Sequence, residues 1–460
     1  MVTQPRIVIA ATRSGDGKTT VATGLMSALR AAGRRVSGHK VGPDYIDPSY
    51  HAAATGRPGR NLDPWLTSED LIAPLFLHGA RGADISVIEG VMGLFDGAAG
   101  RGDFASTAHV ARLLDAPIIL VVSAGGAGRS IAATVRGFAS YDPAVRVAGV
   151  VLNQVSSPRH EQILREALAD TGIPVIGALP AEAVLHTPSR HLGLVPAAER
   201  AAGVRDWLPA LTAIVTEHLD LELVTAIARA APPLHTAPWS AAFPALAGGA
   251  LDGKPGAPVR VAVAGGTAFT FGYAEHDELL AAAGAEVAEF DPMTASALPD
   301  GTDALVIGGG FPELYARELA ANVALRAEVA RRVAAGMPVV AECAGLLWLG
   351  STLEGHPQCA VLPSAATMSQ KLTLGYREAV TLTASPLADA GTVIRAHEFH
   401  RTTSQPVHGD SPAWRLLDGS QQGWATPTLL ASYLHVHWAA LPNAAGRLVG
   451  AAISARSASR

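Results

Sequence analysis

Apolar, β-branched runs recur through the first half of the chain, and each precedes an Ala- and Leu-rich segment whose apolar residues have helical spacing. The apolar residues in each run are continuous, which is typical of parallel strands covered on both faces. The runs lie at residues 7–11, 36–40, 85–89, 118–123, 147–153 and 175–178. This pattern predicts an α/β domain with a parallel sheet that extends to about residue 230.

The pattern repeats after a change in composition. Residues 230–239 and 247–258 are rich in Pro and Gly, which is typical of a linker. Further strand-like runs follow at residues 259–264, 304–307 and 339–342, with a helical pattern over residues 319–335. We therefore expect two α/β domains, at residues 1–230 and 259–460, joined by a linker at residues 231–258.

Composition narrows the class of protein. With 460 residues and 49% hydrophobic side chains, the chain can form two or three globular domains. Its formal charge of −5 argues against a nucleic-acid binder with a broad basic face. Two cysteines, Cys343 and Cys359, are too few for a disulfide framework, so the cytosol is the expected compartment. No run reaches the roughly 18 apolar residues of a membrane span, and the first apolar run is too short for a secretory leader.

The clearest motif is a phosphate loop between the first strand and the first helix. Backbone N–H groups of such a loop hold phosphate oxygens, while its lysine adds charge and the next hydroxyl binds Mg²⁺. Thr12 replaces the first glycine of the usual pattern, so the loop is a variant, and a simple glycine-rich turn is the alternative. We assign ATP binding to Ser14, Gly15, Asp16, Gly17, Lys18, Thr19 and Thr20.

Carboxylates follow two other predicted strands of the first domain. Ligands of such sheets bind outside the carboxyl ends of the strands, so Lys40, Asp44 and Asp47 are expected at the substrate or acyl-phosphate site. We expect Thr19, Asp44 and Glu89 to hold the metal, with Asp44 preferred over Asp47. The alternatives are an aspartate that braces the Asp-Pro turn and a glutamate at a surface strand end.

Cys343 lies between a β-branched run and an apolar helical run, where a strand-to-helix turn exposes a nucleophile. A helix N-terminus stabilises a thiolate, so a lowered pKa is expected for this thiol. His435 and His437 alternate along a strand-like run, so only one of them can meet the thiol. Gly309 and Gly310 can supply backbone N–H donors to an oxyanion. A buried structural cysteine is the alternative.

Two other features of the second half stay ambiguous. The segment Arg395-Ala-His-Glu-Phe-His-Arg401 follows strand-like residues 392–394 and either lines a site for an anion or forms a solvated edge strand. Cys359 is expected to be structural.

The order of the motifs resembles the cobyrinate or hydrogenobyrinate a,c-diamide synthase family. The match covers nearly the whole chain, and its Lys-Val-Gly-Pro-Asp-Tyr-Ile-Asp-Pro element is far more specific than a phosphate loop alone. Residues 270–276 resemble the actinobacterial, aerobic-pathway branch. The matching motifs are Ser14-Gly-Asp-Gly-Lys-Thr-Thr20, Lys40-Val-Gly-Pro-Asp-Tyr-Ile-Asp-Pro-Ser-Tyr-His51, Asn61-Leu-Asp-Pro64, Glu89-Gly-Val-Met-Gly-Leu-Phe-Asp-Gly97, Ala341-Glu-Cys-Ala-Gly345, His397-Glu-Phe-His400 and Ser432-Tyr-Leu-His435.

The resemblance implies an ATP-dependent synthetase domain, like that of dethiobiotin synthetase, followed by a class I glutamine amidotransferase domain. Cys343 would be the glutaminase nucleophile and His435 its base, whereas His437 stands where most class I glutaminases carry a glutamate. ATP and Mg²⁺ would convert a corrinoid carboxylate into an acyl phosphate, which ammonia from glutamine then attacks. Ammonia that reached water would be protonated, so a sheltered route is expected.

The resemblance further implies a cytoplasmic enzyme of small molecules, a corrinoid polycarboxylate, L-glutamine and ATP, with no nucleic-acid or membrane partner and a homodimer as one candidate assembly. Cobyric acid synthase and nickel sirohydrochlorin a,c-diamide synthase share both domain types and are alternatives. CTP synthase is disfavoured because it should carry His-Pro-Glu at the C-terminal histidine. A regulatory ATPase with an inert amidotransferase domain should lack Cys343 or His435, or end in a membrane-binding amphipathic helix.

Overall fold

The structure is a computed structural model that describes residues 1–182, 189–190, 193–194, 201–242 and 258–458. The chain divides into two compact units, Met1–Trp239 and Ser240–Arg460. Both units are α/β, which confirms the predicted fold class. Of the predicted linker, residues 243–257 lie outside the described residues.

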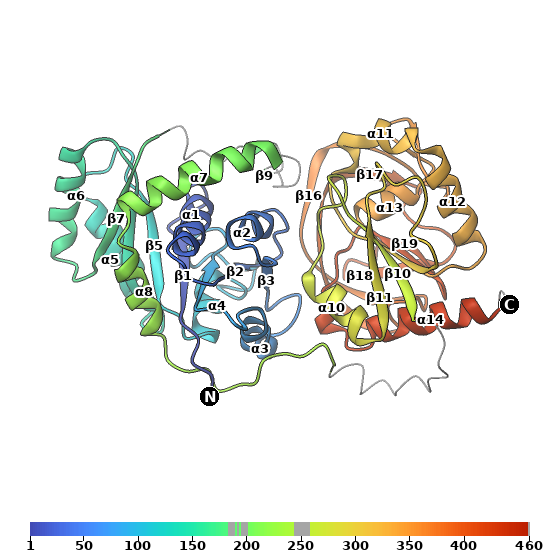
Figure 1. Ribbon diagram of the computed structural model, residues 1–460, viewed down its shortest axis with the longest axis horizontal. Helices are drawn as coiled ribbons and strands as arrows, with labels where there is room; N and C mark the ends of the chain where they lie inside the picture. Colours follow the sequence, from blue (N-terminus) through green and yellow to red (C-terminus); the bar gives the residue numbers. More distant parts are fainter. Residues whose placement is uncertain (183–188, 191–192, 195–200, 243–257, 459–460) are drawn as a thin grey trace. The chain divides into compact units, whose positions relative to one another are not determined.

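The first unit is built on a parallel sheet, which within the described residues has the order β3-β2-β4-β1-β5-β6-β7. Figure 1 shows this sheet flanked by helices. All residues of β1, β2 and β4 are buried, as expected for strands covered on both faces. The strands are β1 (Arg6–Ala11), β2 (Val36–Val41), β3 (Arg60–Leu62), β4 (Ile85–Glu89), β5 (Ile118–Ser123), β6 (Val147–Val155) and β7 (Val175–Pro180), with a small pair β8 (Ser189–Arg190) and β9 (Gly193–Leu194).

The strand order brings three loop-bearing strand ends together. Because β4 lies between β1 and β2, the carboxyl ends of these strands are neighbours at one edge of the sheet.

The helices of this unit are α1 (Lys18–Ala31), α2 (Asp47–Thr55), α3 (Glu69–Gly79), α4 (Thr107–Leu113), α5 (Ile131–Ser140), α6 (Pro158–Ala169), α7 (Ala201–His218) and α8 (Leu221–Arg229).

The segment just after α8 belongs to the first unit, although a linker was expected from residue 231. Leu234 forms an antiparallel bridge with Val2. Trp239 donates its backbone N–H to Pro74 at 2.9 Å and packs edge-on against His78, with ring centroids 5.0 Å apart. These apolar and backbone contacts explain why a Pro-rich segment is packed here instead of serving as a linker.

The second unit contains a mixed sheet, which within the described residues has the order β11-β10-β12-β13-β20-β19-β18-β16-β14-β15, with β17 paired to β16. Its parallel part comprises β10 (Val259–Ala264), β11 (Ala285–Phe290), β12 (Thr302–Ile307), β13 (Val339–Glu342) and β20 (Leu429–Ser432). The other strands are β14 (Thr352–Leu353), β15 (His356–Pro357), β16 (Ala365–Thr381), β17 (Val393–Gln405), β18 (Pro412–Leu416) and β19 (Gln421–Thr426).

The helices of this unit depart from the sequence pattern in one place. The helix expected over residues 319–335 is two helices, because Asn322 ends the first and caps the second by accepting the N–H of Leu325 at 3.4 Å. The helices are α10 (Ala274–Ala282), α11 (Ala316–Ala321), α12 (Val323–Ala334), α13 (Ala344–Leu349) and α14 (Ala444–Ala458), with 3₁₀ turns η3 (Pro312–Tyr315) and η4 (Trp438–Ala440).

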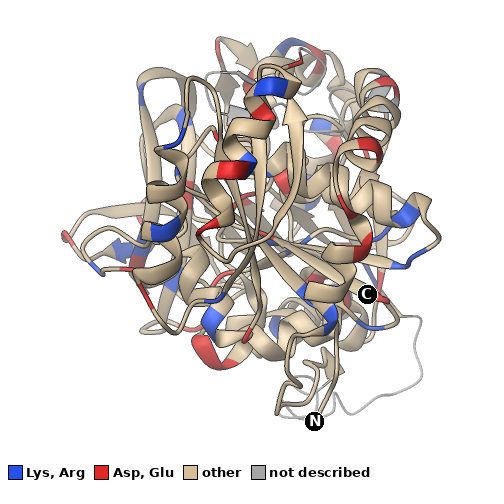
Figure 2. Ribbon diagram, turned by 90° about the vertical axis from the view of Figure 1, so that its left-hand side faces the viewer, with Lys and Arg blue, Asp and Glu red and all other residues tan. Residues whose placement is uncertain are grey.

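Two further properties of the described residues are the distribution of their charges and the length and composition of their helices. Lys and Arg residues are interspersed with Asp and Glu residues along the ribbon in Figure 2, in keeping with the small net charge of −5. None of the helices in the described part of the chain combines the length and the apolar composition needed to cross a bilayer.

Candidate active sites

Hydrogen bonds from nearby side chains fix the conformation of the phosphate loop. Gly17 has φ +96°, and a Cβ there would lie 2.2 Å from the Asn153 amide nitrogen, so only glycine fits. Asn153 donates that amide to the Asp16 carbonyl at 2.8 Å. The Asp16 carboxylate in turn accepts the hydroxyl of Thr12 and the Arg13 guanidinium, the latter at 3.2 Å. Thr12, which replaces the usual glycine, therefore helps to fix the loop.

Lys18 begins α1 with its side chain largely buried. Its ammonium donates to the backbone carbonyl of Met92, in the loop after β4. Burial, and then the charge of Lys40, lower the pKa of Lys18. Ser14 and Gly15 are exposed at the mouth of the loop, whereas Thr20 is buried in the helix. Lys18 thus lies at the loop with a partner that it can exchange for a phosphate.

A buried network joins the ends of three elements beside the phosphate loop. Glu89, the last residue of β4, accepts the Thr19 hydroxyl at 2.6 Å and the Lys40 ammonium at 3.0 Å through Oε1. Lys40 also donates to Asp47, and His51 contacts Glu89 Oε2 at 2.7 Å. The predicted Thr19, Lys40, Asp47 and Glu89 therefore converge. His51 was not predicted, although it ends the motif that begins at Lys40.

Asp44 does not take the position expected of it. Its Oδ1 accepts the backbone N–H groups of Ile46 and Asp47, at 2.7 and 3.0 Å, so it caps the turn before α2. The Asp47 carboxylate, by contrast, lies 3.5 Å from the Thr19 hydroxyl. In this arrangement Asp47, and not Asp44, approaches Thr19, because the Asp44 side chain accepts backbone N–H groups at the start of the helix.

The charges of the network depend on one another. Burial, followed by the charges of Asp44 and Glu89, raises the pKa of Asp47 well above its ordinary value. Burial opposes ionisation of Lys40 and Glu89 too, but charges outweigh it: Asp47 and then Glu89 raise the pKa of Lys40, while Lys40 and then His51 lower that of Glu89. Lys40 supplies one positive charge between these two carboxyl groups. Thr19, Asp47 and Glu89 offer the hard oxygen ligands that fit Mg²⁺, which usually completes its shell with water and substrate phosphate.

Cys343 occupies the sharp turn between β13 and α13. Its φ of +49° and ψ of −98° are uncommon for a residue with a side chain, and such strain is typical of a nucleophile at a strand-to-helix turn. The turn brings Gly345 close to the backbone of Ile307. A Cβ at Gly345 would lie 2.5 Å from the Ile307 carbonyl oxygen, which leaves no room for a side chain. Cys343 is 2% exposed, and its sulfur lies 3.7 Å from the Phe399 carbonyl, to which it donates.

Two backbone N–H groups, those of Gly310 and Ala344, point at the Cys343 sulfur. Gly309, the other glycine expected at an oxyanion site, instead donates its N–H to the Phe271 carbonyl at 3.1 Å. Burial, and then Glu313, raise the pKa of the thiol, and the two N–H groups offset only part of the rise. A lowered pKa was expected from the helix N-terminus, but burial outweighs this short helix.

His435 and His437 reach different surroundings, although not by alternation along a strand. β20 ends at Ser432, and His435 forms an isolated bridge with His397 through two backbone hydrogen bonds of 2.8 and 3.0 Å. Its ring lies against Gly309, where a Cβ would be 2.4 Å from Cε1. Burial keeps the pKa of His435 well below its ordinary value, so the ring is a neutral base. His437 packs on Tyr273, with ring centroids 4.4 Å apart.

The segment from Arg395 to Arg401 lies within β17 instead of following a strand. Glu398 is buried and accepts from Arg377 at 2.7 Å, and it contacts His400 at 3.1 Å. The His400 ring stacks on Tyr433, with centroids 3.7 Å apart. Since the Phe399 carbonyl accepts from the thiol, this part of the segment lies at the Cys343 site, while Arg395 at its start is exposed. Cys359 is buried in the core of the unit.

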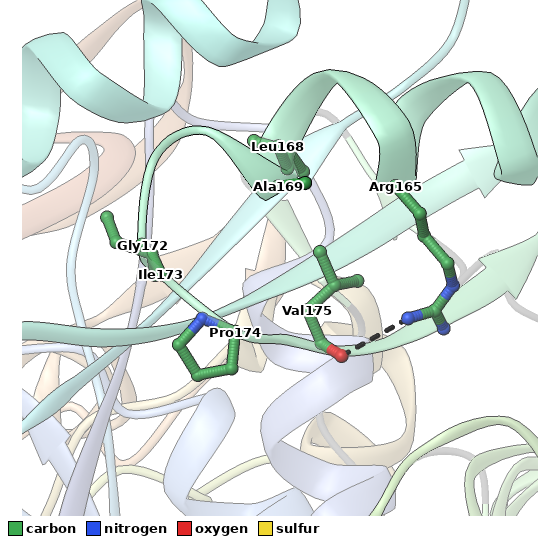
Figure 3. Close-up of a pocket in the computed structure, with 7 residues that line it drawn as sticks. All are labelled: Arg165, Leu168, Ala169, Gly172, Ile173, Pro174 and Val175. Atoms are coloured by element: carbon green, nitrogen blue, oxygen red, sulfur yellow. Dashed lines mark hydrogen bonds between the residues drawn. The ribbon is translucent and has the colours of Figure 1, made fainter.

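A pocket of about 410 Å³ lies away from these residues, between the end of α6 and the start of β7 (Figure 3). Its walls include Leu168, Ile173 and Pro174, and the Arg165 guanidinium donates to the Val175 carbonyl at 3.3 Å. The start of a parallel strand lies at the sheet edge opposite the phosphate loop. The pocket is therefore not part of the nucleotide site.

The two halves of the chain match two known protein-domain families. Residues 7–195 match the CobQ/CobB/MinD/ParA nucleotide binding domain, and residues 260–442 match the CobB/CobQ-like glutamine amidotransferase domain. With the phosphate loop in the first region and the Cys343 turn in the second, the chain is a nucleotide-binding glutamine amidotransferase.

Relatives of similar length define the family more narrowly. The chain is 55% identical to hydrogenobyrinate a,c-diamide synthase of Streptomyces coelicolor, over 97% of each chain. It is 52% identical to the protein of the same name from Thermobifida fusca, over 98% of each. Cobyrinate a,c-diamide synthase of Gloeobacter violaceus is 46% identical over 96% of each. The chain belongs to the a,c-diamide synthase family, which confirms the predicted family and the predicted enzyme class, a ligase with glutamine as nitrogen donor.

Proposed function

We propose that the chain amidates the a and c side-chain carboxylates of hydrogenobyrinate, at the expense of ATP and glutamine. The observation that carries this proposal is the presence in one chain of the Thr19–Asp47–Glu89 network beside a phosphate loop and of a strained, buried Cys343. The cobalt-free ring is proposed because the Streptomyces coelicolor and Thermobifida fusca relatives, 55% and 52% identical, are named for hydrogenobyrinate, whereas the Gloeobacter violaceus relative named for cobyrinate is 46% identical.

In the first unit, the substrate carboxylate attacks the γ-phosphoryl group of ATP and forms an acyl phosphate, with ADP as the leaving group. Lys18 exchanges the Met92 carbonyl for phosphate oxygens, where its charge stabilises the transition state. Mg²⁺, held by Thr19, Asp47 and Glu89, supplies further charge neutralisation when bound. Ammonia then attacks the acyl carbon, and phosphate leaves.

In the second unit, Cys343 supplies that ammonia. The thiol gives its proton to His435, and the sulfur attacks the amide carbon of glutamine. The N–H groups of Gly310 and Ala344, which already face the sulfur, hold the oxyanion. His435 passes the proton to the leaving ammonia, and water then hydrolyses the glutamyl thioester to glutamate.

Two substitutions test this division of labour. Cys343→Ala should abolish glutamine-dependent amidation and leave amidation with high ammonia intact, whereas Lys18→Ala should remove amidation from both nitrogen sources. Cys359→Ala, at the other buried cysteine, is the matched control and should keep both activities. Products are followed by mass spectrometry with hydrogenobyrinate and with cobyrinate as substrates.

Two successive amide-for-acid mass changes are expected on hydrogenobyrinate. Glutamine-dependent turnover by Cys343→Ala would rule out this thiol as the nucleophile. Turnover by Lys18→Ala at the wild-type rate would separate the phosphate loop from the synthetase reaction. Two changes on cobyrinate alone would assign the cobalt-containing ring instead.

A further inference from the structure

The acid that should orient His435 is not at the usual position. Class I glutaminases generally carry it two residues after the histidine, where this chain has His437. The His437 ring is turned to a different set of groups, with Nε2 3.8 Å from the Glu275 carboxylate. His276 lies 5.9 Å from it, centroid to centroid. Position 437 thus belongs to a separate buried cluster.

Glu342 lies beside His435, where an acid could orient the imidazole ring. Its Oε2 is 3.8 Å from His435 Nδ1, and its Oε1 accepts the Val436 N–H at 3.4 Å. Both side chains are buried, with 9% of Glu342 and 1% of His435 exposed. Glu342 is the last residue of β13, and it pairs in register with Ser432, the last residue of β20. The same strand therefore delivers this carboxyl group and, one residue later, the nucleophile.

We propose that Glu342 is the positioning residue of His435 and replaces the acid that class I glutaminases place two residues after the histidine. The inference rests on the proposed roles of Cys343 and His435. With Nδ1 on the side of Glu342, the other ring nitrogen, Nε2, would receive the thiol proton in the proposed mechanism. A carboxylate on Nδ1 also stabilises the imidazolium that forms when the ring accepts the thiol proton.

The surroundings of the pair determine its dependence on pH. Burial raises the pKa of Glu342 to about 8, with the Val436 N–H and Trp438 opposing the rise. His397 and His400, from β17, join burial in lowering the pKa of His435. A carboxyl group with a raised pKa is neutral below that pKa and gains its charge above it. The glutaminase rate should therefore rise as the pH passes through about 8.

The test compares Glu342→Gln, Glu342→Asp and the matched control Glu275→Gln, which changes the acid beside His437. Glutaminase kcat and KM and the rate of Cys343 alkylation by iodoacetamide are measured from pH 6 to pH 10, a range of roughly two units on each side of the transition. Glu342→Gln should lower kcat at least about 100-fold, with little change in KM, and remove the step near pH 8 from the kcat profile, while its alkylation profile keeps only the rise that comes from ionisation of the thiol itself.

The other variants sharpen the result. Glu342→Asp should retain the alkaline rise with a lower plateau, and Glu275→Gln should resemble the wild type. Wild-type profiles in Glu342→Gln would overturn the inference, as would a loss confined to Glu275→Gln. If Glu342→Gln fails to fold, a wild-type plateau in Glu342→Asp overturns it. Cys343→Ala tests the proposed function separately from the inference about Glu342. Glutaminase activity in that variant would refute Cys343 as the nucleophile, whereas the Glu342 variants test only how His435 is positioned.

Discussion

At the scale of single residues, the two aspartates of the motif that begins at Lys40 have opposite surroundings. Asp47 is buried among Lys40 and Thr19, whereas Asp44 caps a turn. Asp47→Asn should therefore lower amidation with either nitrogen source by about 100-fold, because it removes a proposed carboxylate ligand of Mg²⁺ and with it positive charge at the transferred phosphoryl group. Asp44→Asn should change the rate little and cost at most about 0.5 kcal/mol of stability, because an Asn side-chain oxygen can accept the same two N–H groups.

Initial rates with high ammonia, together with thermal unfolding of both variants, decide between the two aspartates. A larger loss of rate in Asp44→Asn than in Asp47→Asn would restore the ranking expected from the sequence. The test is informative because the two substitutions are chemically identical and lie three residues apart.

The sequence predicted those residues whose role follows from a motif and missed those that depend on side-chain direction. Lys18, Thr19 and Glu89 are placed by a strand end or a loop, so their convergence could be predicted. The choice between Asp44 and Asp47 depends on which backbone N–H groups lie nearby, and no spacing rule reports this. Glu342 was read only as the end of a strand, because its neighbour His435 lies far away in the sequence.

At the scale of elements, continuous apolar runs predicted the buried parallel strands closely. The run at residues 118–123 is β5 and that at residues 339–342 is β13, with unchanged bounds. The long hairpin of β16 and β17 was missed because β16 is mostly exposed or half-buried and lacks an apolar run. Backbone pairing between distant residues, which stabilises such a hairpin, has little signature in a local pattern.

The start of α10 allows a prediction about pH and stability. Burial, then Glu289 and Glu278, raise the pKa of Asp277 to about 6. Below about pH 4 the group is neutral in both the folded and the unfolded chain, whereas between pH 4 and 6 the folded chain holds more protons, so stability falls as the pH rises. Asp277→Asn should remove this loss, with a gain of about 1 kcal/mol at pH 8 after allowance for solvent screening of a partly exposed side chain.

Thermal unfolding of the wild type and of Asp277→Asn at pH 4 and at pH 8 checks this sign. The midpoint of the transition that belongs to the second unit should differ little at pH 4 and should be higher for the variant at pH 8. A variant with the same midpoint as the wild type at pH 8 would show that Asp277 ionises in the folded chain without cost.

At the scale of the whole molecule, the chain joins a reaction that consumes ammonia to one that releases it. Free ammonia is protonated in neutral water and is then no nucleophile, so its release into solvent would waste glutamine. A reactant that stays with its molecule has a far higher effective concentration than one that diffuses away. We therefore expect the ammonia made at Cys343 to be used mainly by the phosphate-loop site of the same molecule.

A mixture of two variants, each inactive when glutamine is the nitrogen source, tests this expectation. Cys343→Ala keeps the synthetase site and Lys18→Ala keeps the glutaminase site, so an equal mixture contains both activities on different molecules. With glutamine as the nitrogen source, the mixture should amidate at a rate at least about tenfold below that of the wild type at matched site concentration. Added ammonium salt should restore the rate, which shows that the Cys343→Ala sites are competent. If the mixture matches the rate of the wild type without added ammonium, ammonia passes between the two sites through bulk water. The presence of both domains in one chain would then give no advantage in ammonia transfer.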